Sequence, residues 1–195
     1  MGIDEQCGIL CTKSHSKKEL EKFRFLIDEE YRVQWQLDGL PVTMRIEDEE
    51  YIERGFPLGY VESVDGGKDA HFLYNHVRII VKYSENEEEF DGKRIVGFEV
   101  VPMSVNHQVA GADGVQNASP TLSTCKKDDP YVIEKQDPQS LEGKDVEVLY
   151  TYDVNWEESE ISWANRYDIY LKTNPDDEIH YFSIVNSLMI LLFLT

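Results

Sequence analysis

Apolar and polar side chains alternate in several stretches of this 195-residue chain, and this period constrains the fold more than any other feature. In residues 33–37, VQWQL, the valine, tryptophan and leucine alternate with two glutamines. The same alternation recurs in residues 42–46, 77–81 and 146–152. Because successive side chains of a β-strand point to opposite faces, each stretch predicts a half-buried strand.

Turn residues separate these predicted strands. Asp38-Gly39 lies between the first two strands and is a typical hairpin turn. An acidic segment that ends in Asp91-Gly92 joins the strand at 77–81 to a returning strand at 95–101, which predicts a second hairpin. A last short strand is expected where Tyr167, Ile169 and Leu171 alternate.

One early segment has a helical pattern instead. Ser16 is a helix-capping residue, and Glu19 stands three positions later, as in a capping box. The apolar residues that follow recur at helical spacing, namely Leu20, Phe23, Leu26 and Ile27. The pattern predicts an amphipathic helix that ends near Tyr31.

These elements predict an α+β fold, mainly an antiparallel β-sandwich with one early helix. The chain contains 11 Tyr, 8 Phe and 3 Trp, and aromatic residues favour strands. Residues 104–130 are rich in small and polar residues and are expected to form a long loop. That loop carries an N-glycosylation sequon at Asn117, followed directly by Pro120.

The charge balance excludes some classes of partner. The chain has 19 Lys and Arg against 38 Asp and Glu, for a formal net charge of −19. Nucleic-acid binding requires clustered basic residues, and anionic membrane surfaces attract the same residues. We therefore expect neither nucleic-acid binding nor docking on an anionic leaflet. The acidic runs at 47–50 and 85–89 are interpreted as solvated surface, since neither has the register of a calcium-binding loop.

Motifs for catalysis or cofactor binding are missing from the sequence. The five His form no metal-binding pair, and the chain has no nucleophile elbow, phosphate loop or dinucleotide fingerprint. No catalytic, cofactor or metal residue is therefore assigned, and no enzyme activity is expected. Cys7, Cys11 and Cys125 are best explained by one long-range disulfide and one free thiol, if the compartment is oxidising.

The segment NWEESEISWANRYDIYL is unusually rich in aromatic and charged residues. We interpret Trp156 and Trp163 as structural anchors, with Arg166 paired to one of the acids between them. Two alternatives remain open. The tryptophans could be stacking platforms of a carbohydrate- or ligand-binding module, or two carboxylates could form a hydrolase pair.

The last residues, FSIVNSLMILLFLT at 182–195, carry no charge. A helix needs about 20 apolar residues to cross a bilayer, and this run is shorter. We expect it to be the beginning of a truncated transmembrane helix. The expected organisation is a β-rich domain at 1–180 and the start of that helix at 181–195.

The chain resembles a known family from about residue 7 to residue 195. The stretches that carry the resemblance, in order, are YRVQWQLDGLPV, RGFPLG, YNHVRIIVKY, FEVVPMSV, YTYDVNWEESEISWANRYDIYL and IHYFSIVNSLMILLFLT. Together they are similar to the luminal domain of the nonaspanins, also called the transmembrane nine superfamily or endomembrane protein 70 family.

The resemblance implies a function that the composition does not. Family members have a cleaved signal peptide, a large luminal domain and nine membrane helices, reside in Golgi and endosomal membranes, and are linked to sorting of other membrane proteins. The chain is therefore expected to be a non-enzymatic luminal fragment without cofactor, whose partners are membrane-protein cargo and its own membrane helices. Cys11 and Cys125 stand where the family often has cysteines, so the resemblance also implies a Cys11–Cys125 disulfide.

Overall fold

A computed structural model describes residues 2–45, 52–64, 67–85, 92–110, 121–125, 133, 136–171 and 176–194. The predicted glycosylation site at Asn117 and most of the two acidic runs lie outside these residues. The predicted α+β class, with mostly antiparallel strand pairs, is confirmed.

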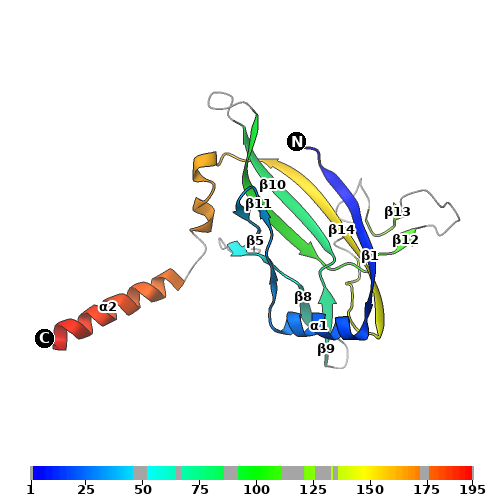
Figure 1. The fold of residues 1–195 in the computed structure, drawn as a ribbon, viewed down its shortest axis with the longest axis horizontal. Coiled ribbons are helices and arrows are strands. Elements are labelled where there is room, and N and C mark those ends of the chain that lie inside the picture. Colours follow the sequence, from blue (N-terminus) through cyan, green and yellow to red (C-terminus); the bar gives the residue numbers. More distant parts are fainter. Residues whose placement is uncertain are drawn as a thin grey trace.

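A six-stranded sheet forms the centre of the molecule, with the strand order β1-β14-β10-β11-β5-β6. Its strands are β1 (Glu5–Ser16), β14 (Asp145–Glu158), β10 (His76–Glu85), β11 (Lys93–Met103), β5 (Thr43–Arg45) and β6 (Ile52–Arg54). Figure 1 shows the long strands side by side, with β1 at one outer edge.

The predicted hairpin of residues 77–81 and 95–101 is confirmed as the antiparallel pair β10–β11, and the strand at 146–152 lies inside β14. Two parallel pairs were not predicted: β10 runs parallel to β14, and β11 runs parallel to β5. Alternation reports which side chains share a face, but it carries no information about the neighbouring strand.

The predicted strand at 33–37 is two short strands in the structure. β2 (Arg32–Val33) pairs with β7 (Phe56–Pro57), and β3 (Gln36–Leu37) pairs with β4 (Leu40–Pro41). The predicted turn at Asp38-Gly39 is confirmed, with φ values of 49° and 79°. Positive φ at both central residues is the requirement of a two-residue type I′ hairpin turn.

Two further small sheets complete the strand inventory of the described residues. β8 (Gly59–Val64) pairs with β9 (Lys68–Leu73). β12 (Val109–Ala110) pairs with β13 (Thr121–Leu122), within the segment that was predicted to be a long loop.

The early helix is confirmed as α1 (Lys17–Asp28). Both the backbone N–H and the hydroxyl of Ser16 donate to the Glu19 carboxylate at 2.9 Å, so the predicted capping interaction forms. The helix ends three residues before Tyr31, and Glu30 takes a left-handed φ of 53°. Its buried face packs into one hydrophobic cluster, which contains Leu20, Ile27, Leu73, Leu141 and Val148.

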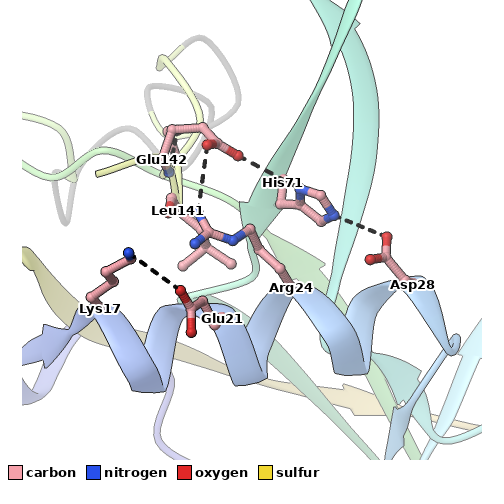
Figure 2. Close-up of polar contacts among 8 residues, drawn as sticks. Lys17, Glu21, Arg24, Asp28, His71, Leu141 and Glu142 are labelled. Carbon is pink, nitrogen blue, oxygen red and sulfur yellow. Dashed lines mark hydrogen bonds and ion pairs between the residues drawn. The ribbon is translucent and has the colours of Figure 1, made fainter. Parts of the chain in front are cut away.

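Polar contacts hold α1 against β9 and the segment before β14 (Figure 2). Arg24 donates to the Leu141 carbonyl at 3.0 Å and lies 3.5 Å from the Glu142 carboxylate. His71 of β9 lies between two carboxylates, 2.9 Å from Asp28 and 3.6 Å from Glu142. These contacts fix the orientation of the helix beneath the sheet.

The last predicted strand is wrong. Residues 163–165 and 168–170 form two 3-10 turns, η2 (Trp163–Asn165) and η3 (Asp168–Tyr170). The buried residues here are Arg166 and Tyr170, and the Tyr170 hydroxyl donates to the Pro41 carbonyl at 2.9 Å. Tyr167 and Leu171, two of the three residues whose alternation predicted the strand, are exposed, so this alternation does not mark a buried strand face.

The chain ends in helix α2 (Asp176–Leu194), which projects away from the sheet in Figure 1. Its described side chains, residues 184–193, are all exposed. None of the helices in the described part of the chain has the combined length and apolar character needed to cross a membrane. The division of the chain at 180/181 stays a prediction.

A buried histidine and aspartate network beside a disulfide

The structure pairs Cys7 with Cys125, across a sequence separation of 118 residues and a Cα–Cα distance of 5.7 Å. Cys11 is free and exposed. The expected Cys11–Cys125 disulfide is therefore wrong, although one long-range disulfide and one free thiol are both present.

A β-bulge explains why Cys11 is not the partner. In β1, Ile9 lies opposite Thr151 and Cys11 lies opposite Tyr150, so two steps along β1 match one step along β14. An extra residue reverses the alternation of the faces beyond it. Ile9 therefore packs with Cys7 against the cluster that contains Cys125, while Cys11 shares the opposite face with Tyr150, which packs against the α1 cluster.

Asp153 of β14 is buried directly beside the disulfide. The Cys7 backbone N–H donates to its Oδ1 atom at 2.8 Å. The two cysteine Sγ atoms and a carboxylate oxygen of Asp153 all lie within 4.8 Å of one another. Burial opposes ionisation of this carboxyl, but the hydrogen bonds from His76 and from the Cys7 N–H outweigh it, and the pKa of Asp153 lies below its ordinary value.

His76 is fully buried, and its partners fix its tautomer. Its Nε2 atom lies 3.2 Å from Asp153 Oδ2, and an ionised carboxylate can only accept a hydrogen bond. His76 must therefore carry its proton on Nε2. In the neutral ring, its Nδ1 atom accepts from the Thr151 hydroxyl, which lies 2.8 Å away.

His107 continues the chain of hydrogen bonds. Because the Thr151 hydrogen is given to His76, Thr151 Oγ1 accepts from His107 Nε2 at 2.7 Å. His107 Nδ1 accepts from the Thr124 hydroxyl at 2.9 Å, and Thr124 accepts from the Gln108 N–H at 3.3 Å. Burial lowers the pKa of His107 to about 4, with the neighbouring His76 as the second cause. Every donor in this network thus has an acceptor when both rings are neutral.

Asn75 fixes the loop that carries His107. Its side-chain amide donates to the carbonyls of Val105 and Leu149 at 2.8 and 2.9 Å, and its Oδ1 atom accepts from the Val105 N–H at 2.8 Å. The buried amide therefore ties the segment after β11 to β14. Residues 105–108, residues 122–125, β10, β14 and β1 all meet at this one site.

Arg78 of β10 adds the positive charge that faces Asp153. Its Nε atom lies 3.5 Å from Asp153 Oδ2. The site therefore contains a carboxylate, a compensating guanidinium and a disulfide, and two hydrogen-bonded imidazoles complete it. None of its residues except the cysteines had been singled out from sequence, since they come from segments far apart in the chain.

The anchor residues named from sequence lie elsewhere. The Trp156 ring of β14 lies 6.5 Å from the Tyr83 ring. Trp163 is 43% exposed, and the guanidinium groups of Arg166 and Arg94 lie 4.7 and 5.2 Å from its ring. The structure therefore brings Trp163 and Arg166 together and leaves Trp156 with Tyr83.

The expected partner of Arg166 is also wrong. Its Nη1 atom lies 2.7 Å from Asp38 in the β3–β4 turn and donates to the Ile95 carbonyl at 3.2 Å, so it does not pair with an acid between the tryptophans. A hollow of about 540 Å³ does lie in that region, and neither tryptophan is among its lining residues, which are Ser84, Glu85, Glu158, Ser159, Glu160 and Ser162.

Comparisons with known proteins give a consistent assignment. The family model described as Endomembrane protein 70 matches residues 1–195. Transmembrane 9 superfamily member 10 of Arabidopsis thaliana is 38% identical over 206 residues, which cover all of this chain and 31% of that protein. Transmembrane 9 superfamily member 4 of Homo sapiens is 33% identical over 216 residues, which cover 100% of this chain and 31% of that protein.

A third relative is a Dictyostelium discoideum protein named Putative phagocytic receptor 1a. It is 36% identical over 196 residues, which cover 95% of this chain and 28% of that protein. The chain thus spans less than a third of the length of these curated relatives. No solved structure matches it. Because the family model matches every residue and relatives above 30% identity cover the whole chain, this chain belongs to the endomembrane protein 70 family, the transmembrane 9 superfamily.

Proposed function

We propose that this chain is the luminal, non-enzymatic portion of a multi-pass protein that sorts and localises other membrane proteins in the Golgi and endosomes. The Cys7–Cys125 disulfide is the observation that carries the luminal placement. Disulfides persist in the lumen of the secretory pathway, whereas the cytosol keeps thiols reduced. Membership of an endomembrane family supports the same placement.

Helix α2 supports attachment of the domain to a membrane. Apolar side chains are exposed along its described part, including Ile184, Leu188, Leu191 and Phe193. A continuous apolar surface of this kind requires cover by lipid or by other helices. The relatives are more than three times as long as this chain, so their remaining length could supply such helices.

A role without catalysis is supported by the names of the relatives, which denote superfamily membership or a receptor and no reaction. In the carbohydrate-binding alternative, Trp163 would offer an open ring face to a sugar. Arg166 and Arg94 both lie over that ring, so the structure does not favour this alternative.

Protease protection tests the proposed side of the membrane. An epitope inserted in this domain of the full-length protein should survive protease in sealed Golgi and endosomal vesicles and be digested after detergent is added. An epitope on a cytosolic loop should be digested without detergent. Digestion of the domain epitope in sealed vesicles would contradict the luminal placement.

Surface proteomics tests the sorting role. Removal of the full-length protein should change the surface abundance of a defined set of membrane proteins, and re-expression should restore it. Cargo that co-purifies with the full-length protein should belong to that set. An unchanged surface proteome, with the protein confirmed in the correct membranes, would contradict the role.

A further inference from the structure

The side chains of Cys7, Cys125 and Asp153 are all of types that bind metal ions, and they lie close together. The two Sγ atoms and a carboxylate oxygen lie within 4.8 Å of one another. Two thiolates and a carboxylate are ligands that zinc accepts, and soft thiolates favour zinc over calcium or magnesium. We propose that, when the disulfide is reduced, Cys7, Cys125 and Asp153 bind one zinc ion.

The charges of the reduced site would balance around zinc. Two thiolates and the Asp153 carboxylate supply three negative charges, and zinc supplies two positive ones. Arg78, 3.5 Å from the carboxylate, faces the one negative charge that remains. Neutrality is a strong requirement here because Asp153 is 3% exposed and Cys125 is 7% exposed. Without a metal, two thiolates beside this carboxylate would repel one another, so the half-buried Cys7 and the buried Cys125 stay protonated thiols.

The carboxylate is already held in place by its neighbours. The Cys7 N–H, His76 Nε2 and Arg78 Nε all lie within hydrogen-bonding range of its two oxygens, at 2.8, 3.2 and 3.5 Å. These hydrogen bonds orient the carboxylate and leave at least one of its lone pairs free for a metal. In known zinc sites, residues around the metal ligands make hydrogen bonds of the same kind. His76 is therefore a positioning residue for Asp153, and the fourth zinc position stays open to water.

The sulfur atoms need only a small movement. Thiolates bound to tetrahedral zinc at ~2.3 Å lie about 3.8 Å apart, which requires the former disulfide partners to separate by rotation about their side chains. Their Cα atoms lie 5.7 Å apart. The residues around them, in β1, β14 and residues 122–125, are the ones that the hydrogen-bond network holds together.

The reaction balances with a dithiol as reductant. The dithiol transfers two electrons and two protons to the Cys7–Cys125 bond, which breaks to give two thiols, while the dithiol becomes a disulfide. Zinc then replaces the two thiol protons, which pass to solvent. A small-molecule disulfide reverses the sequence: it accepts two electrons from the two thiolates and two protons from solvent, becomes two thiols, and the Cys7–Cys125 bond re-forms as the ion is released. The site would therefore hold zinc in the reduced state and a disulfide in the oxidised state.

Zinc titration of the full chain in detergent tests the proposal. Cys11→Ser removes the free thiol, and this variant serves as the parent. After reduction and anaerobic removal of the reductant, it should take one zinc ion per chain from a chromophoric chelator, and the oxidised parent should take none. Asp153→Asn should weaken binding by at least about tenfold, while Asp145→Asn, an exposed change on the same strand, should not.

Cobalt in place of zinc keeps the test decisive if the Asp153 variant fails to fold. The reduced parent should show the absorption of tetrahedral cobalt with two thiolate ligands, and Cys125→Ser should lose it. Zinc should also raise the melting temperature of the reduced parent. The proposal is overturned if the reduced parent binds no zinc, if Asp153→Asn folds and binds as tightly as the parent, or if cobalt shows no thiolate absorption.

Discussion

His107 Nε2 is hydrogen-bonded to the Thr151 hydroxyl at 2.7 Å, and through that single oxygen it connects the segment after β11 to the buried His76. Thr151 is thus the junction of the network. We expect Thr151→Val to destabilise the protein by about 2–3 kcal/mol, because both imidazoles lose a partner in a buried place. Urea unfolding measures the change. Thr12→Val, at an exposed position of β1, is the matched control, and equal effects of the two changes would contradict the role of Thr151.

The low pKa of His107 predicts a loss of stability in acid. Its pKa is about 4 in the folded protein, against about 6.5 for an ordinary histidine, so the unfolded chain binds more protons between these values. The contribution of His107 is therefore complete above pH 6.5 and declines as the pH falls towards 4. We expect about 1–2 kcal/mol of this loss between pH 7 and pH 5. His107→Gln should reduce the difference measured by urea unfolding at the two pH values, and an unchanged difference would refute the assignment.

The disulfide assignment predicts a definite labelling pattern. Alkylation without reduction should modify Cys11 alone, and peptide mapping should recover Cys7 linked to Cys125. Because the closed loop is long, Cys125→Ala should lower stability by about 4 kcal/mol in the chain-entropy model. Cys11→Ala should change it little. Recovery of a Cys11–Cys125 peptide would show that the strand register described here is incorrect.

Arg166 is predicted to hold the 3-10 turns against the sheet. Its guanidinium contacts Asp38, the Ile95 carbonyl and the Trp163 ring, so Arg166→Met should cost about 2–3 kcal/mol. Arg166→Lys should recover only part of this loss, because lysine cannot reproduce the planar stacking. Arg94→Met tests the more exposed guanidinium over the same ring and should have a smaller effect. Unfolding by urea ranks the three variants, and a reversed order would contradict the role of Arg166.

The elements that the sequence predicted well are those decided by neighbouring residues. Ser16 and Glu19 form their capping contacts within one helical turn, and Asp38-Gly39 forms its turn because few residues other than Gly, Asn and Asp accept positive φ. The β10–β11 hairpin likewise needs only two alternating stretches and a turn. The strand predicted at Tyr167 to Leu171 failed because its alternation was incidental, and the buried contact that decided the local structure is made by Tyr170 with Pro41.

The sequence by itself determined the α+β class, the early helix, the central hairpin and the presence of one disulfide and one free thiol, because local periodicity, turn chemistry and cysteine number are properties of the chain. Only the tertiary structure decided that Cys7 is the bonded cysteine, since a single extra residue between Ile9 and Cys11 turns the latter to the other face of the sheet. It also decided the parallel pairing of β10 with β14, which brings His76 to Thr151 and Asp153. The buried site depends on register between strands some 75 residues apart in the chain, and no local pattern encodes that register.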